Sequence, residues 1–119
     1  MVQPVPIRND QVTATILSGA ALSDAITLYG RNITGILLPA SCTTADITLS
    51  VSLDGSTYAD LYDASGEYVL SAAASVFIGV NVAALLGFNY VKLRSGTTGT
   101  PVNQAADRSI ILTLGDFTR

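Results

Sequence analysis

Four acidic residues lie close together in the sequence and are the first candidates for chemistry: Asp54, Asp60, Asp63 and Glu67. Two carboxyl groups facing each other across a cleft can hydrolyse a glycosidic bond, and carboxylates on loops can hold Ca²⁺. Their spacing does not match the regular calcium loop, and Asp54 and Asp63 each stand beside turn residues. We therefore expect these two residues to shape turns, and we expect neither catalysis nor a metal site here.

The residues needed for nucleophilic chemistry are missing. The sequence has no histidine, which removes Ser-His-Asp and Cys-His catalysis and histidine-ligated zinc. Cys42 is the single cysteine, so it cannot form an internal disulfide. With no histidine to activate its thiol, Cys42 is expected to be a small apolar filler. We expect no enzymatic activity and no cofactor.

The charge of the chain restricts its partners. Its 119 residues carry a net charge of −3, and only 13% of them are charged, against about 25% in a typical domain. A nucleic-acid site needs clustered basic residues, whereas the six here are scattered: Arg8, Arg31, Lys92, Arg94, Arg108 and Arg119. No nucleic-acid partner is expected. A surface of Thr, Ser, Asn and Gly suits a protein that packs against neighbours.

Neither a membrane span nor a signal peptide is expected. The longest apolar stretches, Ile33–Ala40 and Val76–Leu86, are too short or too interrupted to cross a bilayer. The first ten residues, MVQPVPIRND, lack the charged region and apolar run of a signal peptide. We expect the chain to be made in a cytoplasm and to stay soluble.

Short alternating segments predict the fold. In Asp46–Leu53, apolar residues at every second position alternate with Thr and Ser, which indicates a half-buried strand. Asp54-Gly55 then supplies residues that tolerate the positive φ angles of a tight hairpin turn, and Thr57–Tyr62 returns. Further strands are expected at Gln11–Ser18, Ser23–Tyr29, Ile33–Pro39, Glu67–Leu70, Val76–Val80, Tyr90–Arg94 and Arg108–Leu114, with one helical turn at Asn81–Leu86.

This pattern predicts an all-β, single-domain antiparallel β-sandwich or jelly roll of about eight strands. The domain is expected to span residues 11–119, after an extended N-terminal arm at residues 1–10. The near-continuous apolar run Ile33–Pro39 is expected to be a central strand buried on both faces, or to lie at a sheet crossover. Residues Val91, Leu93, Ile110, Leu112 and Leu114 are expected to face the core.

Two segments are candidates for partner contact. Val2, Val5 and Ile7 give the arm apolar groups to bury against a neighbouring subunit. The long polar loop Ser95–Asp107 is the second candidate, because long loops in compact domains are often functional. Its contact residues are expected to be Thr97, Thr98, Thr100, Asn103 and Gln104. Lys92 and Arg94 could meet a carboxylate or phosphate there; the favoured interpretation is that Arg94 and Arg108 pair with Asp107 or another local carboxylate.

Three motifs carry a resemblance to a known class of protein. They are S-x-DG-x-TY-x-x-LYD at Ser52–Asp63, VKLRSG at Val91–Gly96 and PVNQAADR at Pro101–Arg108. The chain from about Ile47 to Leu114 resembles small structural proteins of tailed-bacteriophage virions. It is also similar, at the level of the fold, to the discoidin-like jelly roll, which says little about function.

The resemblance implies a virion component, most similar to capsid cement or decoration proteins. Such a protein is expected on the capsid surface, as a homo-oligomer, typically a trimer, with the major capsid protein as its partner. The alternatives are a carbohydrate- or receptor-binding module of a phage tail or head fibre, and a low-copy tail or neck assembly protein. The receptor-binding module would use the Ser95–Asp107 loop with nearby tyrosines.

Overall fold

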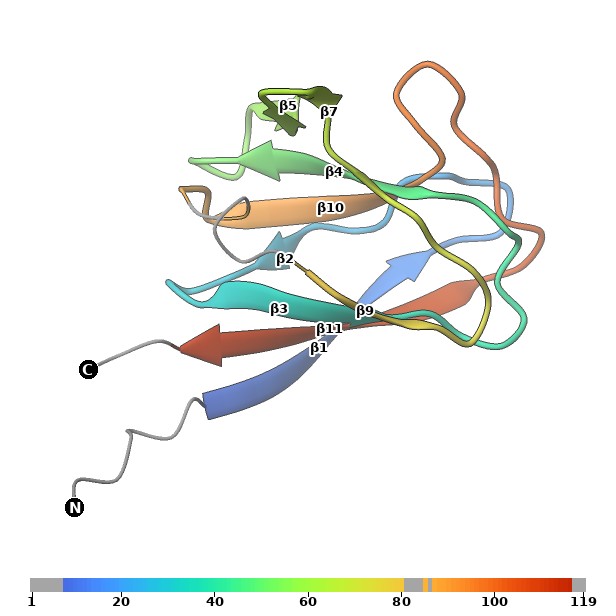
Figure 1. Ribbon diagram of the computed structural model, residues 1–119, viewed down its shortest axis with the longest axis horizontal. Helices are drawn as coiled ribbons and strands as arrows, with labels where there is room; N and C mark the ends of the chain where they lie inside the picture. Colours follow the sequence, from blue (N-terminus) through green and yellow to red (C-terminus); the bar gives the residue numbers. More distant parts are fainter. Residues whose placement is uncertain (1–7, 81–84, 86, 117–119) are drawn as a thin grey trace.

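The computed structural model describes residues 8–80, 85 and 87–116, and these residues form an all-β fold. Two antiparallel sheets enclose one hydrophobic core, and a small hairpin lies beside them (Figure 1). The prediction of an antiparallel β-sandwich is confirmed. Eleven strands are described where about eight were expected, because several are only two or three residues long.

The first sheet, called sheet I below, joins the two ends of the domain. Its strand order is β1-β11-β3-β9, for strands Arg8–Ile16, Arg108–Asp116, Asn32–Leu37 and Phe77–Gly79 respectively. β1 and β11 pair along their whole length, from Arg8 opposite Asp116 to Ile16 opposite Arg108. β1 thus begins at Arg8, inside the arm expected at residues 1–10. Residues 1–7, with Val2, Val5 and Ile7, lie outside the described residues.

The second sheet, sheet II, is built around β10 (Tyr90–Ser95) and β4 (Ile47–Ser52). Its order is β2-β10-β4-β5, with β2 at Ile26–Thr27 and β5 at Tyr58–Asp60, and β8 (Val69–Leu70) also pairs with β4. β6 (Tyr62–Asp63) and β7 (Gly66–Glu67) form the separate hairpin. The strand expected at Ser23–Tyr29 is reduced to β2. The expected turn Asn81–Leu86 lies outside the described residues, apart from Leu85.

Alternating side chains from both sheets fill the core, as predicted. Ile110, Leu112 and Leu114 of β11 and Val91 and Leu93 of β10 are fully buried. Burial of large aliphatic side chains is the main stabilising contribution to such a fold, about 1.5–3 kcal/mol each. The core therefore holds the two sheets together and fixes the loops that connect them.

β3 corrects one expectation about burial. The segment Ile33–Pro39 was expected to be a central strand buried on both faces, or to lie at a sheet crossover. It is central, between β11 and β9, but Leu37 is exposed. The pairing of β3 with β11 shifts between Thr113 and Leu114, so that Gly35 faces Thr113 and Ile33 faces Leu114. This bulge adds one residue on the β3 side, so Ile33 and Ile36 both reach the core although they are three residues apart.

The hairpin predicted from the alternating segment is present. β4 and β5 are antiparallel, with Ser52 opposite Tyr58, and residues 53–57 connect them. Gly55 has a φ of +83°, a conformation that glycine adopts without strain. The connection is longer than a two-residue turn.

Candidate partner-binding site

The loop between β10 and β11 crosses from sheet II to sheet I and projects from one end of the sandwich (Figure 1). It is the long loop predicted at Ser95–Asp107. Thr98, Gly99, Thr100, Pro101 and Asn103 are exposed, whereas Thr97 is half-buried. We call residues 97–101 the loop tip. No ionisable side chain lies in it.

The loop tip is a small hairpin of its own. Gly96 and Pro101 form an isolated antiparallel bridge, and Val102 N donates to Ser95 O at 2.8 Å. Thr97 and Thr100 exchange two backbone hydrogen bonds of 3.2 Å each, and Thr100 N also donates to Thr97 Oγ1 at 3.1 Å. The tip therefore has a defined backbone conformation although it is exposed.

Gly96 makes this hairpin possible. Its φ is +91°, and a Cβ added there would lie 2.4 Å from Thr100 O and 2.7 Å from Val102 N. Both contacts are to backbone atoms, which cannot move away without opening the hairpin. At Gly99, by contrast, an added Cβ would meet no atom within 4 Å.

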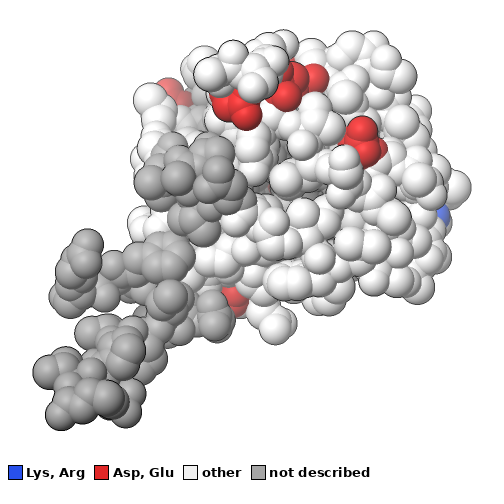
Figure 2. All heavy atoms as spheres, viewed as in Figure 1, with Lys and Arg blue, Asp and Glu red and all other residues white. Residues whose placement is uncertain are grey.

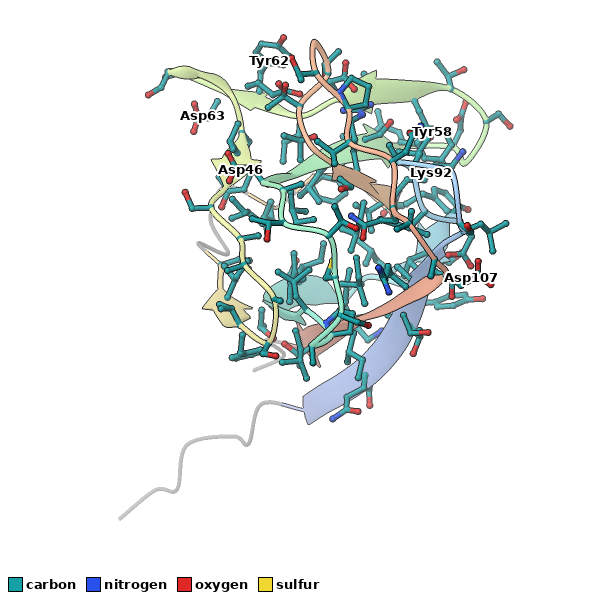
Figure 3. All side chains as sticks on the ribbon, turned by 90° about the vertical axis from the view of Figure 1, so that its right-hand side faces the viewer. Asp46, Tyr58, Tyr62, Asp63, Lys92 and Asp107 are labelled. Atoms are coloured by element: carbon teal, nitrogen blue, oxygen red, sulfur yellow. The ribbon has the colours of Figure 1, made fainter. Side chains whose placement is uncertain are left out.

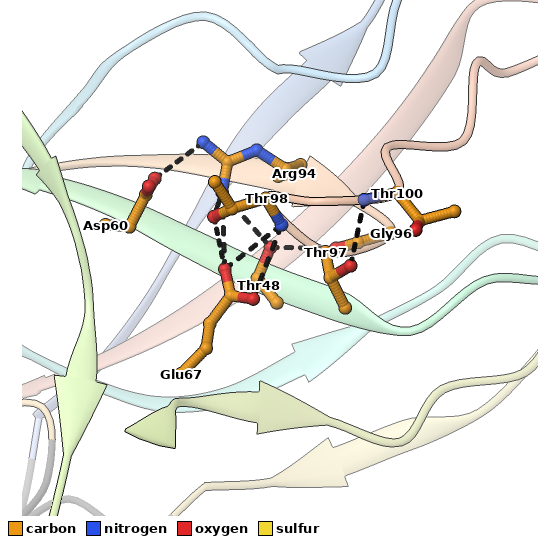
Figure 4. Close-up of polar contacts among 8 residues, drawn as sticks. All are labelled: Thr48, Asp60, Glu67, Arg94, Gly96, Thr97, Thr98 and Thr100. Carbon is orange, nitrogen blue, oxygen red and sulfur yellow. Dashed lines mark hydrogen bonds and ion pairs between the residues drawn. The ribbon is translucent and has the colours of Figure 1, made fainter.

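Arg94 of β10 braces the tip against sheet II and the small hairpin (Figure 4). Its Nη2 lies 2.7 Å from Asp60 Oδ1, and its Nη1 lies 3.7 Å from Glu67 Oε2. The same Nη1 donates to Thr98 Oγ1 at 3.0 Å. Thr98 N donates to Glu67 Oε2 at 3.2 Å, and the Thr98 hydroxyl makes a second bond to that oxygen. One guanidinium thus ties two carboxylates and the tip together.

The electrostatics of the brace favour the ionised form of Asp60. The hydrogen bond from Arg94 lowers the pKa of Asp60, with burial acting in the opposite direction. Arg94 and Arg108 were expected to pair with Asp107 or another local carboxylate. Arg94 does so, with Asp60 and Glu67 as partners. Arg108 instead donates to uncharged side chains. Asp107 takes another role, since its Oδ1 accepts from Ser18 N at 2.8 Å.

The other two basic residues near the loop also have partners within the chain. Lys92 Nζ lies 4.5 Å from the centre of the Tyr58 ring, a cation–π contact across sheet II, and Figure 3 shows the two side chains near each other. Arg108 donates from Nε to Gln104 Oε1 at 3.1 Å and from Nη1 to Ser41 Oγ at 3.1 Å. These contacts favour a structural role for the basic residues over anion binding.

Gln104 holds the second end of the loop and corrects one prediction. It was expected to contact a partner, but only 1% of its surface is exposed. Its Oε1 accepts from Thr43 N at 2.9 Å, and its Nε2 donates to Ser95 Oγ at 2.7 Å and to Thr43 O at 3.3 Å. A buried amide with all these bonds is a clamp inside the domain and cannot reach a partner.

The neighbouring Cys42 fits its predicted role. It is half-buried and packs against the core, and burial raises the pKa of its thiol, with an opposing effect from Arg108. Its Sγ lies 3.6 Å from Gln104 Oε1. A raised pKa keeps the thiol protonated and unreactive at neutral pH.

The turn roles predicted for two carboxylates are confirmed. Asp54 Oδ1 accepts from Ser56 N at 2.8 Å and Thr57 N at 2.9 Å, and these backbone bonds lower the pKa of Asp54. Asp63 Oδ1 accepts from Ser65 N at 2.7 Å. Within residues 8–80, 85 and 87–116, no three potential metal ligands come together.

The face shown in Figure 2 carries acidic side chains near the β5–β7 end and almost no basic ones. The loop tip differs from that surface because it offers only hydroxyl, backbone and proline groups. Asp60, Glu67 and Gln104 were not predicted to hold the loop. Asp60 and Glu67 stood out in the sequence only as part of an acidic cluster, and no sequence signal marks Gln104 as buried.

Comparison with solved structures shows one clear likeness in fold. The chain superposes on the crystal structure of SPBc2 prophage-derived protein YomS with a TM-score of 0.55, at 12% identity, over 94% of this chain and 98% of that one. A structure of Bacillus endospore appendages, described as disulfide-linked pili, matches with a TM-score of 0.36, at 13% identity, over 97% and 93%. That score is too low to support an argument.

The chain therefore shares its fold with a prophage-derived protein. Scans of protein-family models and of curated proteins gave no significant match. In the described part of the chain, no helix has the length and apolar character needed to span a bilayer.

Proposed function

We propose that the chain is a structural protein of a bacteriophage virion that decorates the capsid surface and clamps neighbouring subunits of the major capsid protein. It acts without catalysis and without a cofactor. It self-associates, and the resemblance noted in the sequence favours a trimer. The observation that supports this role best is the loop tip, an exposed and uncharged hairpin fixed at both ends by Arg94 and Gln104.

A pre-formed tip suits a binding role because little conformational entropy is lost when it docks. Its hydroxyl and backbone groups bind through shape and hydrogen bonds, and they add no charge to the contact. The likeness in fold to a prophage-derived protein agrees with a phage origin. A sandwich of this size can cover a junction between subunits while its core stays intact.

The clamping role is tested by adding the purified chain to capsids that lack it. Bound chain is measured by sedimentation with the particles, at about 0.1 M and about 1 M salt. Because exposed charge pairs are screened at high salt, a contact made by the uncharged tip should persist at both concentrations. Release of the chain at about 1 M salt contradicts the proposed mechanism.

A matched pair of variants tests whether the contact lies on the loop tip. Thr100→Lys adds a long charged side chain at the exposed tip and should weaken capsid binding by at least tenfold. Ser56→Lys adds the same charge to the exposed β4–β5 connection and should leave binding unchanged. Equal effects of the two substitutions would remove the tip from the interface.

The second candidate function is receptor binding by a tail or head-fibre protein. The projection of the loop tip from one end of the sandwich favours it, because binding loops occupy that position in many sandwiches. Binding to a set of bacterial surface glycans, lost in Thr100→Lys, would support this alternative.

A further inference from the structure

β1 forms an edge of sheet I, and no other described strand pairs with its outer side. The strand pairs with β11 on its inner side over all nine residues. Figures 1 and 3 show β1 at the border of the sheet. On its outer side, Asp24 covers Thr15: Thr15 N donates to Asp24 Oδ1 at 2.8 Å, and Asp24 N donates to Thr15 O at 3.2 Å.

These two bonds fix which backbone groups point outward. In an antiparallel pair, residues alternate between those that bond to the neighbouring strand and those whose N–H and C=O point away from it. Thr15 points away from β11, and the β1–β11 pairing has no irregularity, so Thr13 and Gln11 also point away. No hydrogen bond from another described residue reaches the main chain of Thr13 or Gln11 on that side.

This edge lacks the usual protection against pairing. Edge strands are commonly guarded by lysine, by proline or by a bulge, and residues 11–15 contain none of these. The first charged side chain before them, Asp10, is paired with Arg31 at 2.8 Å. Two copies with a net charge of −3 repel each other, so an uncharged edge is the place where they can approach closely.

We propose that two copies of the chain pair through β1, antiparallel about a twofold axis at Val12. Gln11 of one copy then faces Thr13 of the other. The outward N–H and C=O groups of these two residues, in both copies, form four inter-chain hydrogen bonds. Asp24, bound to Thr15, limits the contact to this short register. The two four-stranded halves become one continuous eight-stranded sheet.

A contact of this size lies below the range of stable interfaces, so the dissociation constant is expected on the order of 0.1 mM. The high local concentration on a capsid would favour it, and a twofold contact can link trimers that are formed by other surfaces. The inference concerns contact between copies and does not depend on the capsid role. If the chain pairs in solution but is absent from virus particles, the pairing through β1 stands and the proposed capsid role is refuted.

The test combines sedimentation equilibrium with amide NMR spectra of the full chain, from about 10 μM to about 1 mM. With a dissociation constant on the order of 0.1 mM, we expect the weight-average mass to rise by roughly 1.5-fold over this range. The amide signals of Gln11 and Thr13 should shift with concentration. A chain that keeps one mass up to about 1 mM, or that associates with shifts confined to other residues, overturns the proposal.

Thr13→Pro removes an outward N–H and places a ring against the partner strand, which should weaken association by at least tenfold. The monomer tolerates it because proline fits an edge strand when its nitrogen faces solvent. Thr13→Ser keeps the N–H and should associate like the parent. Gln11→Pro provides a second variant of the same kind if Thr13→Pro does not fold. A folded proline variant that associates as tightly as the parent refutes the pairing.

Discussion

Gln104 and Asn103 are adjacent amide residues whose substitutions should differ sharply in effect. Gln104 is 1% exposed and bonded on all sides, whereas Asn103 is exposed. Gln104→Ala leaves Thr43 N–H and the fully buried Ser95 hydroxyl without the partners they have now. Asn103→Ala removes an exposed amide and should change the free energy of unfolding by less than about 0.5 kcal/mol.

The size of the Gln104 effect follows from these contacts. A buried polar group left unpaired costs about 1–3 kcal/mol, which applies in full to the Ser95 hydroxyl and in part to the N–H of the half-buried Thr43. Releasing the ordered glutamine side chain offsets about 1–2 kcal/mol of that cost. We therefore expect Gln104→Ala to lower the free energy of unfolding by about 2 kcal/mol. For a domain of this length the melting temperature should fall by about 8 °C.

Urea and thermal unfolding of both variants and the parent measure this difference. Amide hydrogen exchange measures the effect at the clamp itself. The Thr43 N–H should exchange faster in Gln104→Ala than in the parent, and at the rate of the parent in Asn103→Ala. If the two substitutions lower stability equally, within about 0.5 kcal/mol, then Gln104 does not clamp the loop and the assignment made here is wrong.

Three further predictions follow from the loop and its brace. Gly96→Ala should destabilise the chain by about 2–4 kcal/mol because of its positive φ and two backbone clashes, while Gly99→Ala should change stability by less than about 0.5 kcal/mol; urea unfolding separates them. Arg94→Gln should raise the pKa of Asp60 towards its ordinary value, a shift that the side-chain carboxyl NMR signal follows with pH. Since the pKa of Asp60 is lowered in the folded chain, its contribution to stability is present above the unfolded pKa of about 3.9 and is lost as pH falls towards the folded value. Unfolding curves at several pH values should therefore show that Arg94→Gln loses less free energy of unfolding on acidification than the parent does. An equal loss in the two proteins would contradict the pairing of Arg94 with Asp60.

The sequence predicted the strands where the alternation was strong. β10 and β11 have the predicted inward residues, because each has one face on the core and a period of two. β4 was expected to be half-buried, but Thr48, Ser50 and Ser52 are buried as well as Ile47 and Leu49. The central position of β3 was predicted, but burial on both of its faces was not found. Its apolar run hides a bulge, which depends on pairing with β11 and leaves no local signal.

The loop was predicted from its length, but the way in which it is held was not. Gln104 looks like a solvent-facing residue in a polar loop, and its burial depends on Thr43 and Ser95, which are distant in the sequence or on another element. Asp60 and Glu67 were interpreted only as part of an acidic cluster, because Arg94 meets Asp60 across sheet II and Glu67 on the separate small hairpin. Contacts of this kind are set by tertiary packing.

The central claim, decoration of a capsid, is tested most directly by the copy number of the chain in purified particles of the virus that encodes it. Quantitative mass spectrometry of the particles gives this number relative to the major capsid protein. We expect hundreds of copies per particle, spread over the shell. A count of a few to a few dozen would contradict capsid decoration and place the chain in the tail, neck or fibres, and absence from the particles would refute a virion role.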